Sequence, residues 1–406
     1  MNRNLWLLVV CQGLFLTNNV TFIAINGLVG LSLAPFGWMA TLPIMGYVVG
    51  GALSTMLVAQ TQTRYGRRSS FQLGLAVAVL SALACYYAAY SRNFWLLVGA
   101  TLMAGYYSAN AHLYRFAAAE LAATSFKEKA ISYVMAGGLI GAVLGPNLAS
   151  RTRSLTDVPF AGAYLALAGV ALLAMLLMAF IDFPANQAPA ASGAAVGSNA
   201  SVDSDTKQTN TGRPLAEIMR QPVFVIAASA GALGYGVMNL LMSATPIAMQ
   251  ICGLPFSSVA WVLEWHVIGM FAPGFFTGHL IKRFGVLPIM AIGLGLNLLC
   301  VAIALSGIAF EQFLAALFLL GLGWNFLFTA ATTLALTAYR PEEKDKAQGA
   351  LNFCVFAVLA LSSFASGVLV TTQGWTLLNL GALLPMTIVA IMLGWLARQT
   401  RQLRPT

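Results

Sequence analysis

Long apolar segments alternate with short polar connections over almost the whole chain of 406 residues. Twelve segments reach roughly 20 residues or more, the length at which an α-helix crosses the ~30 Å hydrocarbon core of a bilayer. The pattern therefore predicts an all-α membrane protein with twelve transmembrane helices. The expected spans are 5–31, 36–60, 69–91, 94–121, 129–151, 158–182, 222–249, 256–281, 287–307, 310–338, 346–371 and 375–397.

One polar stretch interrupts this alternation halfway along the chain. The segment "FPANQAPAASGAAVGSNASVDSDTKQTNTGRP" is rich in Ala, Ser, Gly, Asn and Pro and has no periodicity, which is typical of a flexible linker. We therefore divide the chain into an N-terminal six-helix half (1–182), a flexible linker (183–217) and a C-terminal six-helix half (218–406).

Basic residues predict the orientation of the helices. If the N-terminus is cytoplasmic, 18 of the 21 Lys and Arg residues lie at cytoplasmic ends, and Arg92, Arg151 and Arg153 remain outside. Such a bias is the signal that sets membrane topology. Both termini and the linker are therefore expected in the cytoplasm. The first apolar segment has no small-residue cleavage site after a short apolar core, so we interpret it as a spanning helix.

Composition agrees with a membrane protein. The chain is 59% hydrophobic and 8% charged, whereas a soluble domain carries about 25% charged residues. The net charge of +9 resides at the ends of apolar segments, which argues against nucleic-acid binding. Five scattered cysteines form neither a disulfide framework nor a CxxC motif.

Short motifs of the first half recur in the second at a nearly constant separation, which indicates an internal repeat. The pairs are Gly66 in "TRYGRR" with Gly285 in "KRFGVL" (219 apart), Gly105 in "AGYYSA" with Gly323 in "LGWNFL" (218 apart), and "KEKA" at 127–130 with "KDKA" at 344–347 (217 apart).

Two six-helix repeats joined by a cytoplasmic linker resemble the major facilitator superfamily. The superfamily's loop pattern Gly-x-x-x-Asp-Arg-x-Gly-Arg-Arg is matched at Arg64, Gly66, Arg67 and Arg68, but Thr63 stands at the acidic position. "GGLIGAVLGPN" at 137–147 is similar to its glycine-proline motif, although close helix packing through small residues explains the same pattern.

Ionisable residues deep in an apolar helix are costly and are functional candidates by default. The sequence offers His112 and Arg115 in the fourth segment, and Glu264 and His266 in the eighth. We expect Arg115 to extend toward the inner interface or to pair with Glu120, and His112 to make a hydrogen bond between helices.

Two pairs of soft ligands occur at helical spacing in the seventh and eighth segments. Met238 and Met242, like His266 and Met270, are four residues apart and share a helix face. Treating the segments as antiparallel neighbours places Met238 about 5 Å and His266 about 3 Å outward of their midpoints. The two pairs are therefore expected to meet near the bilayer middle, and Pro246 should kink the helix beside Met242.

Thioether and imidazole groups suit a soft ion such as Cu(I). The methionines are also explained by packing, since methionine is a common core filler. This arrangement resembles the CcoA-type copper importers of the bacterial inner membrane, which supply copper to cbb3-type cytochrome oxidase. The resemblance implies metal binding by Met238, Met242, His266 and Met270, with Cys252 and Met249 as outer-side ligands. It further implies copper as transported substrate, copper chaperones or oxidase assembly factors as partners, a monomer, and no enzymatic activity.

Two other hypotheses remain open. The chain is alternatively a proton-coupled carrier of a small organic solute or drug, with Glu264 as the proton site. Aromatic residues that could line its cavity are Tyr106, Tyr107, Trp261, Trp265 and Trp324. A membrane scaffold that assists oxidase assembly is the third hypothesis, and the sequence offers little for it because the linker is short.

Overall fold

The computed structural model describes residues 2–123, 127–183, 212–340 and 343–402, which form helices and turns and contain no strand. In chain order the elements are α1 (Arg3–Leu33), η1 (Gly37–Met39), α2 (Leu42–Tyr90), α3 (Phe94–Ala111), α4 (Tyr114–Leu121), α5 (Lys127–Thr152), α6 (Ala161–Ala179), α7 (Leu215–Arg220), α8 (Pro222–Ile251), α9 (Phe256–Phe271), α10 (Gly274–Phe284), α11 (Val286–Ser306), α12 (Phe310–Ala335), α13 (Lys344–Thr372) and α14 (Gly374–Gln402).

The helices make the twelve crossings that the apolar pattern predicts. Within the described residues, nine segments are individually long and apolar enough to span a membrane, and α9 with α10 makes a tenth across a 43° bend. One of the nine contains α2, which turns back at Gly66 (φ 79°, ψ 167°) and brings Thr61 within 3.0 Å of Ser70, so it crosses twice. The twelfth crossing is α3 with α4, interrupted at His112 and Leu113.

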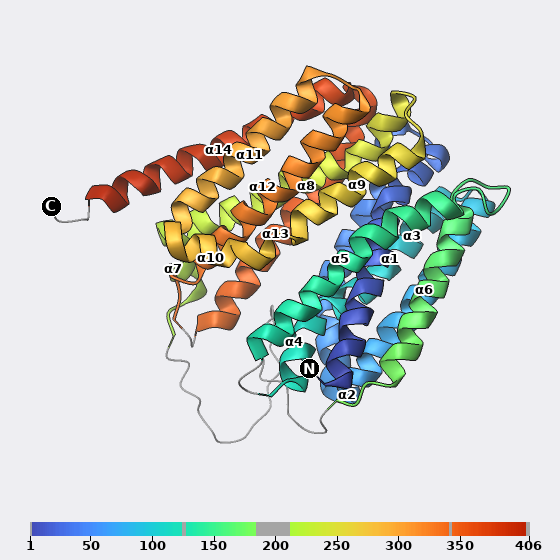
Figure 1. Ribbon diagram of the computed structural model, residues 1–406, viewed down its shortest axis with the longest axis horizontal. Coiled ribbons are helices and arrows are strands. Elements are labelled where there is room, and N and C mark those ends of the chain that lie inside the picture. The colour runs from blue at the N-terminus through green and yellow to red at the C-terminus, as the bar shows by residue number, and fades with distance from the viewer. Residues whose placement is uncertain (1, 124–126, 184–211, 341–342, 403–406) are drawn as a thin grey trace.

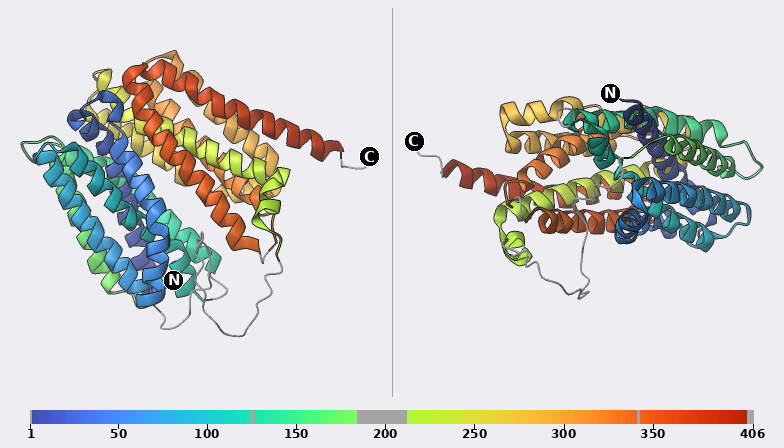
Figure 2. Two further views of the ribbon diagram at one scale, coloured as in Figure 1. Left: turned by 180° about the vertical axis from the view of Figure 1, so that it is seen from behind. Right: turned by 90° about the horizontal axis from the view of Figure 1, so that it is seen from below.

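Two bundles lie side by side and diverge toward the end that carries the linker (Figures 1 and 2). The N half consists of α1–α6, and α8–α14 form the C half. Contacts between the halves run mainly through four pairs of elements: α5 with α9, α2 with α13, η1 with α13, and α1 with α8.

The halves are held together at the end opposite the linker. Thr41 Oγ1 donates a 2.6 Å hydrogen bond to the carbonyl oxygen of Ser363, and both residues are buried. The rings of Phe160 and Phe256 meet edge-to-face, 4.9 Å apart. If the linker end is cytoplasmic, as the distribution of Lys and Arg predicts, the carrier is closed to the outside and faces inward.

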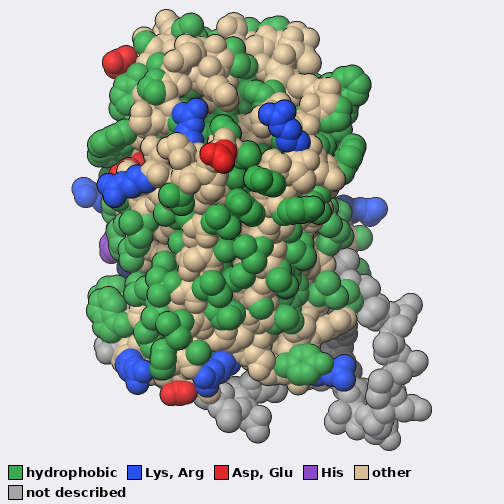
Figure 3. All heavy atoms as spheres, turned by 90° about the vertical axis from the view of Figure 1, so that its right-hand side faces the viewer, with side chains coloured by type: hydrophobic (Ala, Val, Ile, Leu, Met, Phe, Trp, Pro, Cys, Tyr) green, Lys and Arg blue, Asp and Glu red, His purple; other side chains and the backbone are tan. Residues whose placement is uncertain are grey.

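On the face shown in Figure 3, a band rich in hydrophobic side chains lies between one group of charged side chains in the upper part of the view and another at its lower end. The leucines of α6 illustrate this, since Leu172, Leu173 and Leu176 are all exposed. Because so much exposed apolar surface is unusual for a soluble monomer, it fits contact with lipid acyl chains.

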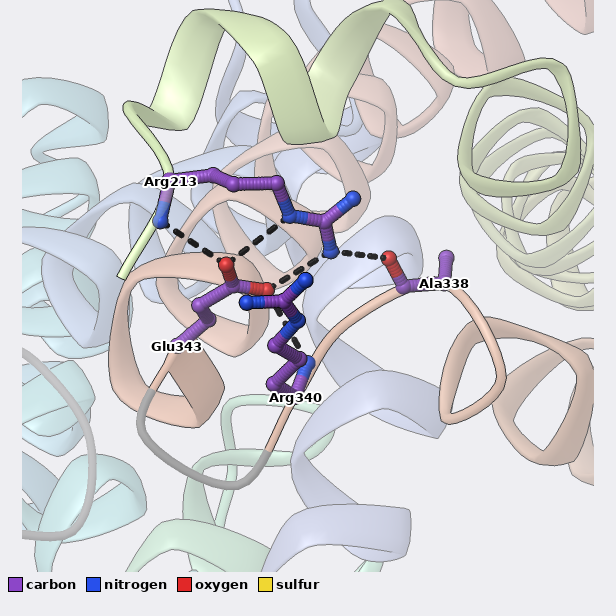
Figure 4. Close-up of polar contacts among 4 residues, drawn as sticks. All are labelled: Arg213, Ala338, Arg340 and Glu343. Carbon is purple, nitrogen blue, oxygen red and sulfur yellow. Dashed lines mark hydrogen bonds and ion pairs between the residues drawn. The ribbon is translucent and has the colours of Figure 1, made fainter. Parts of the chain in front are cut away.

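The C-terminal end of the predicted linker is structured, although the sequence predicts a flexible segment there. Most of it, 184–211, lies outside the described residues, but α7 begins at Leu215 within the predicted bounds. Just before α7, Arg213 donates from Nε and Nη2 to the two carboxylate oxygens of Glu343, at 2.9 and 2.8 Å (Figure 4). Glu343 is fully enclosed, and the guanidinium holds its pKa well below the usual range. We call this pair the Arg213–Glu343 clasp.

Candidate functional site

All four side chains of the predicted metal set are buried. Met238 and Met242 lie on α8, and His266 and Met270 lie on α9, with exposed fractions between 0% and 7%. Each helix presents them to the interior of the C half, as their i, i+4 spacing predicts.

The expectation that the seventh and eighth spans are direct neighbours needs correction. The two helices share few contacts, whereas α12 packs closely against both. A Cβ atom at Gly321 of α12 would collide with the carbonyl oxygen of His266, so the backbones of α12 and α9 are in direct contact there. Neighbours in sequence are separated here because α12 occupies the position beside both helices.

His266 has one paired and one unpaired ring nitrogen. Its Nδ1 lies 2.6 Å from the carbonyl oxygen of Leu317 on α12. A carbonyl oxygen only accepts, so Nδ1 carries the proton and Nε2 keeps its lone pair. Nε2 is buried and has no partner among the described residues. This is the arrangement in which a metal-binding histidine is usually found.

The described part of the chain contains no group of three His, Cys, Asp or Glu side chains arranged to hold a metal ion. A copper site would therefore depend on methionine sulfur together with His266. Met249 is fully buried near the closed end of α8, and Cys252 is half-buried at the end of that helix. Met249 is thus less accessible than its expected place near the outer surface suggests.

Glu264 lies on another side of α9 from His266 and contacts the N half. Its Oε2 accepts a 2.8 Å hydrogen bond from Nδ2 of Asn147, which follows the α5 proline. Both residues are half-buried, and α5 and α9 form a main contact between the halves. The carboxyl group predicted as a proton site therefore lies in the interface between the halves.

A separate pocket lies in the N half, among α1, α2 and α3. It is narrow, with a cavity volume of about 10 Å³, and it is partly open to solvent. Its polar side chains are those of Asn18, Asn19, Ser81, Tyr47 and Tyr107, and the rings of Phe22 and Tyr47 lie 5.0 Å apart. The Ser81 hydroxyl donates to the carbonyl oxygen of Ala100. The Tyr107 hydroxyl is buried and without a hydrogen-bond partner among the described residues.

An aromatic cluster of the C half lies near this pocket. Tyr235 of α8 meets Trp324 and Phe328 of α12 edge-to-face at 5.0 and 5.2 Å, and the two α12 rings stack 5.3 Å apart. Tyr235 and Phe328 pack against the same small cluster of buried residues as Val48 of α2, the chain neighbour of Tyr47. The aromatic cluster of the C half therefore lies beside the α2 wall of the pocket.

Two of the aromatic residues expected in a cavity lie elsewhere. Trp261 and Trp265 are 55% and 41% exposed, so they lie on the outer surface of α9. Tyr106 uses its hydroxyl in a 3.0 Å hydrogen bond with Thr61. Tyr107 lines the N-half pocket, as predicted, whereas Trp324 stacks in the aromatic cluster and is not part of the pocket lining.

Three central residues were missed in the sequence: Asn18, Asn19 and Tyr235. The signal for the first two was available, because adjacent amides inside the apolar first span are as unusual as the charges that attracted attention. Arg115 does not pair with Glu120, which instead binds Arg67. Arg115 is exposed and lies over the ring of Phe116, and His112 is exposed at the break between α3 and α4.

Comparison with known proteins identifies close and distant relatives. Riboflavin transporter RfnT of Brucella anthropi is 37% identical over 393 residues, which cover 96% of this chain and 94% of the relative. A bacterial homologue of the human lysosomal transporter Spinster, solved in an inward-facing and occupied conformation, superposes with a TM-score of 0.72 at 13% identity, covering 99% and 98% of the two chains. A bacterial metal transporter superposes with a TM-score of 0.67 at 14% identity, covering 97% and 98%.

The resemblance to copper importers is thus supported only at the level of the superfamily. The two structural matches share too little sequence to indicate more than the fold. The profile of the Major Facilitator Superfamily matches residues 5–263 and 227–406. With its two helical bundles and these relatives, the chain is a multi-pass membrane transporter, not an enzyme, and belongs to the Major Facilitator Superfamily.

Proposed function

We propose that this protein carries a small planar organic solute into the cell, and that riboflavin is the first solute to test. The observation that carries the proposal is the 37% identity to a riboflavin transporter across 96% of the chain. This is the organic-solute hypothesis of the sequence, with the solute now specified, and it takes precedence over copper uptake.

The central region supports a planar solute. Tyr235, Trp324 and Phe328 supply ring faces and edges, and such aromatic walls favour stacking with a flat ring system. The adjoining pocket offers amide and phenol groups that can fix the orientation of the solute. A flat heterocycle with polar edges matches both features.

Transport would proceed as the halves rock about this central region. Opening to the outside requires separation of α5 from α9, which breaks the hydrogen bond between Asn147 and Glu264. The freed carboxylate could then take a proton from the outside and release it after the interface closes again. Glu264 is therefore the proposed coupling site.

The test uses a riboflavin auxotroph that lacks its own uptake system. Expression of the protein should restore growth at low external riboflavin and give saturable accumulation of labelled riboflavin. Membrane localisation is checked by immunoblot. Absence of accumulation above the empty vector, with the protein present in the membrane, would reject riboflavin as the solute.

Copper uptake is retained as a second candidate because of one observation, the unpaired Nε2 of buried His266. In this proposal Met238, Met242 and Met270 complete the site, Cys252 and Met249 act on its outer side, and a copper chaperone receives the ion. Accumulation of radioactive copper, compared between wild type and Met238→Ala in the same auxotroph, separates the two candidates. Copper uptake that Met238→Ala leaves unchanged would remove this one.

A further inference from the structure

The N-half pocket has the chemistry of a recognition site for a specific ligand edge. Nine residues line it, and none carries a charge near neutral pH. Along α3 and α4, the first cation after Tyr107 is Arg115, which lies eight residues further on and beyond the break at His112 and Leu113. A carboxylate placed in this pocket would lose its hydration without gaining a partner, which is costly. The pocket therefore selects an uncharged group.

Its free polar atoms include both donors and acceptors. The Asn18 amide nitrogen donates to the carbonyl oxygen of Leu167 at 3.3 Å, which leaves the Asn18 amide oxygen as an acceptor. Asn19 is half-buried, and its side chain makes no hydrogen bond with the described residues. Tyr107 is only 4% exposed, and its unpaired hydroxyl group can both donate and accept a hydrogen bond.

A buried hydroxyl group without a hydrogen-bond partner destabilises the folded state. Such a group usually indicates that a water molecule or a ligand supplies the partner. Here the hydroxyl borders a pocket whose cavity volume, about 10 Å³, takes one water-sized group. The pocket can therefore accept a single polar group at the edge of a ligand. The remainder of the ring would extend toward Tyr235, which packs against the same cluster as Val48, the residue after Tyr47.

We infer that Asn18, Asn19 and Tyr107 bind the imide or amide edge of an uncharged planar heterocycle whose ring system stacks on the Tyr235–Trp324–Phe328 cluster. An imide edge presents a donor between two acceptors and so complements an amide–phenol set. The dioxopyrimidine edge of a flavin has this pattern. The inference rests on the proposed function and specifies the part of the solute that the N half recognises.

The test measures equilibrium binding of riboflavin to purified wild type, Tyr107→Phe and Tyr106→Phe by quenching of flavin fluorescence. Tyr107→Phe removes only the orphan hydroxyl and should raise the Kd about tenfold, the effect of one lost hydrogen bond. Tyr106→Phe is the matched control, because the Tyr106 hydroxyl binds Thr61 outside the pocket lining, and its Kd should stay within about twofold of wild type.

Asn19→Ala provides a second variant in case Tyr107→Phe is poorly expressed, and it should weaken riboflavin binding to a similar degree. Wild type should also lose about tenfold in affinity for a flavin methylated at the imide nitrogen, whereas Tyr107→Phe should lose less. Monodispersity of each variant is confirmed by size-exclusion chromatography.

Two ligands separate failure of the inference from failure of the proposed function. Equal Kd values for riboflavin in wild type, Tyr107→Phe and Asn19→Ala would overturn the inference and leave riboflavin transport intact. Tighter binding of the anion 4-hydroxybenzoate than of riboflavin would overturn the preference for an uncharged edge but keep an organic carrier. Binding of neither ligand to the wild type would reject the proposed function, and the inference with it.

Discussion

The two halves of this transporter share a fold but differ in the candidate binding groups that they contain. The N half has an accessible pocket with amide and phenol groups, and the C half has an enclosed set of methionine and histidine side chains. The pocket suits a polar heterocycle edge, whereas the enclosed set suits a soft ion or simple packing. Because these two sites lie in different halves, a single substitution can disable one and leave the other intact.

The repeat also diverges at the end that carries the linker. In the N half, Arg67 of the loop binds Glu120 of α4. At the separation of 219 that relates Gly66 to Gly285, Arg67 corresponds to Val286, so the C half lacks this basic residue. Instead Arg213, which precedes α7, reaches Glu343 and the carbonyl oxygen of Ala338. The ion pair at this end of the C half therefore comes from Arg213, beside α7, whereas that of the N half comes from Arg67 in its own loop.

The largest effect is expected from filling the N-half pocket. Ala104 lines it and is buried, so Ala104→Phe would occupy the space for the solute edge. Flavin uptake should fall about 100-fold, because overpacking cannot be relieved without displacing the ligand. Gly99→Phe on the same helix adds the same ring where the neighbourhood is open, and it should transport normally. Equal uptake by both variants would show that the pocket is not used.

A smaller loss is expected at the interface between the halves. Glu264→Gln keeps an acceptor for Asn147 but cannot exchange a proton. Wild-type uptake should increase as the external pH falls, whereas uptake by Glu264→Gln should be about tenfold lower and independent of pH. Glu311→Gln, at an exposed position in the first turn of α12, is the control. An unchanged pH profile in Glu264→Gln would remove this residue from coupling.

The Arg213–Glu343 clasp should contribute to stability more than to transport. The lowered pKa of Glu343 means that the pair stabilises the fold above the carboxyl's unfolded pKa of about 4.3 and loses this contribution as the pH falls below it. Glu343→Gln should therefore lower the Tm at pH 7, with a difference from wild type that shrinks below about pH 4. Glu120→Gln, which breaks a partly exposed pair, should lower the Tm less. A larger decrease for Glu120→Gln would contradict the difference between the halves.

The smallest effect on flavin uptake is expected from the enclosed set. His266→Asn retains a donor for the carbonyl oxygen of Leu317 and removes the Nε2 lone pair. Flavin uptake should stay within about twofold of wild type, because the substitution changes no residue of the pocket. Copper accumulation measured in the same cells tests the second candidate, since loss of one ligand should reduce it at least about tenfold.

Much of the fold follows from the sequence because bilayer crossing constrains length and polarity so strongly. The spans, the turn at Gly66 and the division into halves required only apolar runs and repeated motifs. Which helices are neighbours required the structure, since α12 lies against both α8 and α9 although it is distant in sequence. The N-half pocket could not be predicted either, because its residues come from helices that are distant in sequence. Asn18 and Tyr107 are 89 positions apart, and no local periodicity relates them.

The central claim is that a planar organic solute moves through the space between the halves and binds at the N-half pocket. Its most direct test is uptake of labelled riboflavin into proteoliposomes that contain purified wild type, Ala104→Phe or Gly99→Phe, with an inward proton gradient imposed. We predict saturable uptake by wild type and Gly99→Phe and almost none by Ala104→Phe. Uptake of copper but not riboflavin by wild type would contradict the account.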